Sequence, residues 1–166
     1  MPNCNFNCCR RGSYYPREVF TCNCLNNCNA GTIINPQPTI ERAVLGITAE
    51  TMVSGNSVVP VSSLFSNGTA VRSSGNGNIS LTAGVYQVSY NITGIVPNGG
   101  FISTALMLDG TQIQTTNSVV SAAPGTIQSV SNQIILNLTQ NQILALFNET
   151  PESVNVISAN ISLLKL

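Results

Sequence analysis

The sequence contains little charge and no histidine. Only 7% of its 166 residues are charged, and six basic and six acidic side chains give a formal net charge of zero. This balance argues against nucleic acid and anionic membranes as partners. Without histidine, the chain lacks the commonest general base near neutral pH and the commonest metal ligand. We therefore expect no enzyme and no bound cofactor or metal.

Long apolar runs are missing as well. Hydrophobic residues make up 43% of the chain, which is enough for a core. No run approaches the roughly 20 residues that cross a bilayer, so we expect no membrane association. Residues 1–7 hold no apolar segment of the kind found in a secretory signal. Because Asn, Ser, Thr and Gln supply the polarity and the net charge is zero, the composition favours self-association.

Cysteine is confined to the start of the chain, and we expect these residues to form disulfide cross-links: Cys4, Cys8, Cys9, Cys22, Cys24 and Cys28. Their spacings lack the C-x2-C pair typical of zinc sites, so disulfides are favoured over a metal. Since no other cysteine follows, each thiol can pair only within this segment, in its own chain or in a neighbour. A cytosolic protein with metal-bound or unpaired cysteines is the alternative.

Composition divides the chain into two parts. Residues 1–38 have no periodicity and include a low-complexity Cys/Asn stretch, and they end in a stiff Asn-Pro-Gln-Pro segment. Fully extended, this connector would reach about 125 Å. Residues 39–166 consist of short β-type runs separated by Gly, Asn, Pro and Asp, and we expect them to form the folded head.

The clearest strand runs over residues 85–93. Its apolar side chains, Tyr86, Val88, Tyr90 and Ile92, alternate with small polar ones, which is typical of a half-buried strand. Further strands are predicted at 43–47, 58–61, 101–108, 112–113, 130–138, 143–147 and 154–166. Turns are predicted at Asn-Gly, Asp-Gly and Pro-Gly pairs. Eight or more short strands spaced by roughly 8–12 residues predict an all-β antiparallel jelly-roll sandwich.

The strand at residues 143–147 is apolar on both faces. We expect one face to pack into the core and the other against a second subunit. The predicted trimer-interface residues are Leu144, Leu146 and Phe147, together with Tyr90.

Four segments carry a resemblance to the C1q/TNF-like jelly roll: ISLTAGVYQVSYNITG, ALMLDGTQI, ILNLTQNQILALFN and VISANISLLKL. More narrowly, they resemble its spore-surface branch, the C-terminal domain of the collagen-like exosporium glycoprotein. The likeness covers about residues 40–166 and implies a trimer. The Cys-bearing N-terminal segment, which stands where a collagen-like stalk often stands, resembles that of endospore appendage subunits.

These resemblances imply a structural subunit of an extracellular appendage fibre on the spore surface. Jelly-roll trimers would stack, joined by the N-terminal connectors and stabilised by disulfides. The protein would be made without a signal peptide in the mother-cell cytosol, and it would be oxidised after lysis. Its partners would be further copies of itself, an exosporium anchor protein and a tip protein. The alternative is a trimeric terminal or coat module that caps a fibre or mediates adhesion.

Overall fold

The computed structural model describes residues 40–166. The predicted connector 1–38 and its six cysteines lie outside the described residues. The elements are β1 (Arg42–Gly46), β2 (Thr51–Val53), β3 (Ser57–Val58), β4 (Ser62–Asn67), β5 (Val71–Gly75), β6 (Asn78–Leu81), β7 (Gly84–Ile95), β8 (Gly100–Leu108), β9 (Thr111–Gln112), the short 3-10 helix η2 (Gln114–Thr116), β10 (Ser118–Ala122), β11 (Ile127–Leu138), β12 (Gln142–Asn148) and β13 (Val154–Lys165). Within this part of the chain, no helix has the length and apolarity to cross a membrane.

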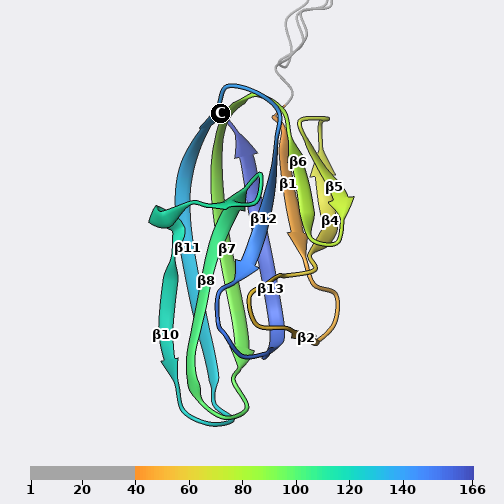
Figure 1. Ribbon diagram of the computed structural model, residues 1–166. Coiled ribbons are helices and arrows are strands. Elements are labelled where there is room, and N and C mark those ends of the chain that lie inside the picture. Colours follow the sequence, from red (N-terminus) through yellow and green to blue (C-terminus); the bar gives the residue numbers. More distant parts are fainter. Residues whose placement is uncertain (1–39) are drawn as a thin grey trace, which may run out of the picture. The chain divides into compact units, whose positions relative to one another are not determined.

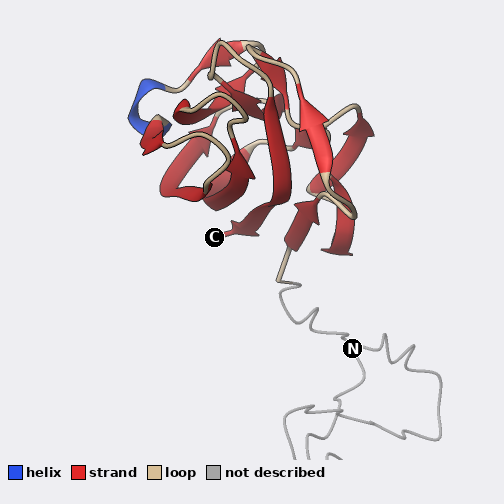
Figure 2. Cartoon of the chain, turned by 90° about the horizontal axis from the view of Figure 1, so that it is seen from below, coloured by secondary structure: helices blue, strands red, loops and turns tan. Residues whose placement is uncertain are grey.

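The strands form two antiparallel sheets that pack face to face (Figure 1). Sheet A has the order β11-β7-β13-β1-β4, with β2 also paired to β13. Sheet B has the order β10-β8-β12-β6-β5, with β3 on β12 and β9 on β8. Figure 2 shows that strands joined by loops build the unit of residues 40–166, and that its one helical turn lies at the margin. The predicted antiparallel sandwich is confirmed.

Strand β7 confirms the alternation predicted from the sequence. Its apolar side chains at 86, 88, 90 and 92 are between 0% and 3% exposed, and the polar side chains between them are half-buried on the opposite face. β7 pairs along its length with β11 on one side and β13 on the other, so its register orients both neighbours. The buried Tyr86 hydroxyl donates to the Thr82 carbonyl at 2.9 Å. Burial of this tyrosine therefore leaves no polar atom unpaired.

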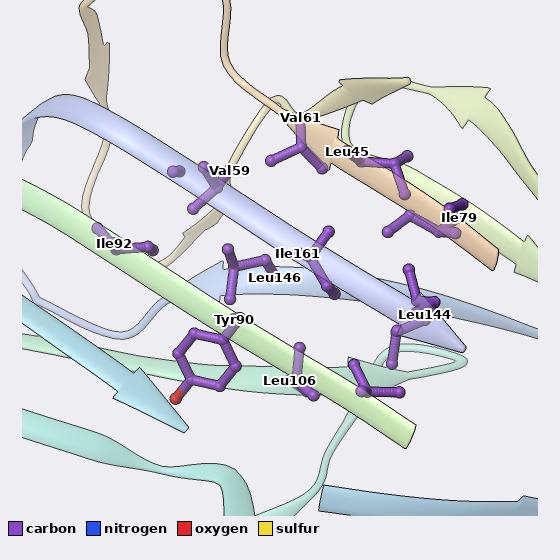
Figure 3. Close-up of a cluster of buried hydrophobic side chains, with 14 of the residues drawn as sticks. Leu45, Val59, Val61, Ile79, Tyr90, Ile92, Leu106, Leu144, Leu146 and Ile161 are labelled. Atoms are coloured by element: carbon purple, nitrogen blue, oxygen red, sulfur yellow. The ribbon is translucent and has the colours of Figure 1, made fainter. Parts of the chain in front are cut away.

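The core lies between the inner faces of the two sheets. Figure 3 shows Leu45, Tyr90, Ile92 and Ile161 of sheet A pointing toward side chains of sheet B, among them Ile79, Leu106, Leu144 and Leu146. The predicted strand 58–61 is shorter than expected, because β3 ends at Val58, two residues before Pro60. Val59 and Val61 are nevertheless 0% and 2% exposed, so this segment still contributes to the core.

Strand β12 has an apolar core face and an apolar outer face, as its sequence predicted. Leu144 and Leu146 are fully buried between the sheets, whereas Ile143, on the opposite face, is 45% exposed. Ala145 and Phe147 share the outer face with Ile143, because side chains alternate along a strand.

We expect the two faces of β12 to differ sharply in their response to truncation. Leu146→Ala removes a fully buried side chain, so it should lower the free energy of unfolding by about 2–5 kcal/mol. The matched control on the same strand, Ile143→Ala, should change it by less than about 1 kcal/mol. Urea unfolding followed by circular dichroism measures both variants. Equal losses would mean that β12 does not present alternate residues to the core.

Candidate subunit interface

The outer face of sheet A carries a regular array of small uncharged polar side chains. The registers of β13, β7 and β11 align them in three cross-strand rows. We call these nine residues the polar face: Ser162, Ser89 and Gln133; Asn160, Asn91 and Ser131; Ser158, Thr93 and Ser129. They face outward because the residues between them on each strand point into the core.

None of the nine residues is charged. The charged side chains of residues 40–166 occur at strand ends, in turns and on β5: Glu41, Arg42, Glu50, Arg72, Asp109, Glu149, Glu152 and Lys165. The middle of sheet A therefore presents a neutral surface. A second copy could approach this surface without bringing like charges together.

Apolar side chains flank the polar face at both ends. At one end Leu164 and Ile135 lie in register on either side of Gln87, and Ile135 is 53% exposed. At the other end Ile95 pairs with Ile127, which is 61% exposed. A partner that covered the whole sheet would bury these side chains as well as the polar rows, which adds hydrophobic stabilisation to hydrogen bonding.

The polar face keeps most of its hydrogen-bonding capacity for a partner. Within it, the Thr93 and Ser129 hydroxyls lie 2.6 Å apart, and the Thr93 hydroxyl also lies 3.5 Å from Asn91 Oδ1. Hydroxyl and carboxamide groups each offer a donor and an acceptor. A surface built only from such groups can pair with a copy of itself. Its chemistry suits association.

Three of the four predicted interface residues lie elsewhere. Leu144 and Leu146 are 0% exposed and Tyr90 is 3% exposed in the single chain. A side chain with no accessible surface has none to bury against another subunit, so these residues stabilise the head itself. Alternation separates the two faces of a strand but does not say which face the core takes, and here the core takes the face of Leu144 and Leu146.

Phe147 lies on the outer face of sheet B, where it keeps partial exposure. It pairs across the strands with the buried Ala105, and Met107 pairs with Ala145 beside it. On this outer face Phe101, Val119 and Ile143 are 41%, 60% and 45% exposed, whereas the small residues Ala105 and Ala145 are already covered. A subunit contact through Phe147 stays a prediction, distinct from one through the polar face.

Glu149, which follows β12, has a local structural role. Its Oε2 atom accepts a hydrogen bond from the Ser103 hydroxyl at 3.0 Å and another from the Asn117 amide. The Glu149 amide in turn donates to the Ser103 carbonyl at 2.8 Å. Across residues 40–166, no group of three acidic, cysteine or histidine side chains is placed to hold a metal ion.

No family model and no curated protein matches the sequence. Solved structures do match the fold. The Eiger TNF of S. frugiperda aligns with a TM-score of 0.64 at 17% identity, over 77% of this chain and 93% of that one. The fold is the C1q/TNF-type jelly roll. Murine APRIL at pH 5.0 (TM-score 0.60, 12% identity, 75% and 99% covered) and the globular domain of zebrafish complement 1qA (0.60, 9%, 74% and 94%) share it. Identities this low establish the fold alone.

Proposed function

We propose that this protein is a structural subunit that associates into trimers through the polar face of its jelly-roll head. The observation that carries the proposal is the absence of charge from all nine residues of that face. In a symmetric trimer, residues near the axis meet copies of themselves. A charged group there would face two like charges, whereas hydroxyls and carboxamides can pair with their own copies. The apolar ends of the face would be buried in the same contact.

We infer that such trimers stack into an extracellular appendage fibre on the endospore, with residues 1–38 as connectors and the six cysteines as cross-links. The support is the resemblance of residues 40–166 to spore-surface heads, and that of the cysteine-bearing segment to appendage subunits. Synthesis in the mother-cell cytosol would allow oxidation after lysis. An exosporium anchor and a tip protein would be the further partners.

A second candidate function is a trimeric terminal or coat module that caps a fibre or mediates adhesion. The low charge of the head and its C1q/TNF-type fold fit this candidate equally well. The two functions differ in one property of the purified protein. A fibre subunit should polymerise by itself, whereas a cap should stop at the trimer.

A single charge in the polar face should dissociate the trimer. Asn91→Asp keeps the size of the side chain but places a carboxylate at the contact, where an unpaired buried charge costs several kcal/mol. Asn98→Asp, in the exposed turn between β7 and β8, is the matched control and should leave the trimer intact. Size-exclusion chromatography with light scattering over a range of concentrations measures both.

An intact trimer from the Asn91→Asp variant would remove the polar face from the interface. Loss of the trimer in a Phe147→Asp variant, with Asn91→Asp unaffected, would instead place the contact on sheet B. A circular dichroism melt of each variant separates loss of association from loss of folding.

Deletion of residues 1–38 should abolish fibres but preserve trimers. The head has its own core within residues 40–166, and we expect the connector to supply the link between trimers. Negative-stain microscopy of the full-length and truncated proteins, with and without a thiol reductant, shows whether fibres form. Long fibres from the truncated protein would contradict the connector role. Trimers without fibres from the oxidised full-length protein would favour the capping function.

A further inference from the structure

An open cleft lined by both polar and apolar groups lies at one end of the sandwich, where four connections converge. It is bounded by the turns β4–β5, β6–β7, β8–β9 and β11–β12, and the last of these arches over the end at which the C-terminus lies (Figure 1). Its volume of about 580 Å³ falls in the range of small-molecule sites. The cleft is lined by Thr69, Ala70, Arg72, Ser80, Leu81, Thr82, Asp109, Asn141, Gln142 and Ile143.

Asp109 supplies a fixed acceptor on one wall of this cleft. It occupies the β8–β9 turn with φ +48°, in the left-handed region that aspartate tolerates in hairpin turns. The backbone N–H of Ile143 donates to Asp109 Oδ1 at 2.8 Å, and the Gln142 side-chain amide donates to Oδ2 at 2.9 Å. Both hydrogen bonds lower the pKa of Asp109, and the bond from the Ile143 backbone N–H has the larger effect. The oriented carboxylate keeps further lone pairs on both oxygens for a ligand.

Donor groups line the same cleft. Arg72 donates through Nε to the Thr69 carbonyl at 3.4 Å, which leaves its two terminal nitrogens for a ligand. The Asn141 side chain is held through Oδ1, which accepts from the Ala83 backbone N–H at 3.1 Å. Its amide NH2 group is therefore oriented by the turn. A charged acceptor and two kinds of donor thus occur in one cleft, and backbone N–H groups orient two of them, Asp109 and Asn141.

We propose that this cleft binds a neutral saccharide. Adjacent sugar hydroxyls need a donor and an acceptor at each position, and carboxylate, guanidinium and carboxamide groups provide them in pairs. Arg72 and Asp109 carry opposite charges, and so do Lys165 and Glu41, which bond to Thr82 Oγ1 and to the Ala70 backbone N–H of the lining. The charged groups at the cleft therefore sum to zero, which gives no net preference for an anion or a cation. The side chain of Ile143, 45% exposed, offers an apolar surface for the C–H face of the ring.

The proposal is independent of the assembly proposed above. The strand residues that line the cleft belong to β5, β6 and β12 of sheet B, whereas the polar face belongs to sheet A. Association through sheet A would leave the cleft open on every subunit. A trimer would then present three copies of a weak site, which raises the avidity for a polymer with repeated sugars.

The test is isothermal titration calorimetry on the full-length protein. The probes are the methyl glycosides of glucose, galactose, mannose and N-acetylglucosamine, each with its matching polysaccharide. At least one should bind saturably. Arg72→Ala and Asp109→Asn should each weaken binding by about tenfold or more, because each removes a charge-assisted hydrogen bond. The control is Glu152→Gln, which makes the same change of charge in the β12–β13 turn, at the end of β12 away from the cleft. Its affinity for the sugar should stay within about twofold of that of the wild type.

Absence of binding to all the probes would overturn the proposal. Binding that both cleft variants leave unchanged would also overturn it, because the sugar would then lie elsewhere. N-acetylneuraminic acid serves as a charged comparison sugar. If it binds and none of the neutral probes does, the ligand is not a neutral saccharide. Asp109→Asn keeps a side chain that tolerates the positive φ, and Arg72 lies outside the core, so both variants should melt within a few degrees of the wild type.

Discussion

The alternation of side chains along β7 is the constraint on which both faces of sheet A depend. β7 lies between β11 and β13 and fixes their registers over twelve and ten residue pairs. Because Tyr86 and Val88 point into the core, Gln87 and Ser89 must point out, and their partners on the neighbouring strands follow. One hydrophobic pattern therefore closes the sandwich and, at the same time, builds an uncharged outer surface.

The distribution of charge then separates two surfaces of the head. Sheet A keeps its centre free of ionisable groups, which suits contact between identical subunits. At one end of sheet B, Asp109 and Arg72 share a cleft with carboxamides and hydroxyls, which suits recognition of a polar small molecule. A structural function and an adhesive function need not compete, since each would use a different sheet of the same jelly roll.

Much of the fold could be predicted from the sequence because its long strands are strongly periodic. β7, β11 and β13 are twelve residues each, and Asp109-Gly110 forms its expected turn. The sequence pattern does not predict the strands β2, β4, β5, β6 and β10. β4 reads Ser-Ser-Leu-Phe-Ser-Asn and is exposed throughout, so no buried side chain imposes a period on its sequence.

The candidate interface could not be predicted from single strands. The polar face exists only once three strands are in register, and that register follows from long-range pairing. Phe147, by contrast, carries a local signal, a large apolar residue on a two-faced strand, which the structure assigns to the outer face of sheet B. Convergence of Asp109 and Arg72 in one cleft also depends on topology, since 37 positions separate them in the chain.

We expect the subunits to meet through the outer face of sheet A, and electron cryo-microscopy of the purified full-length assembly would show the contact itself. We expect β7, β11 and β13 of each head to face its neighbours, with Asn91 and Ser131 buried at the contact and β12 turned outward. A map in which β8 and β12 form the contact and the polar face lies open to solvent would contradict this account.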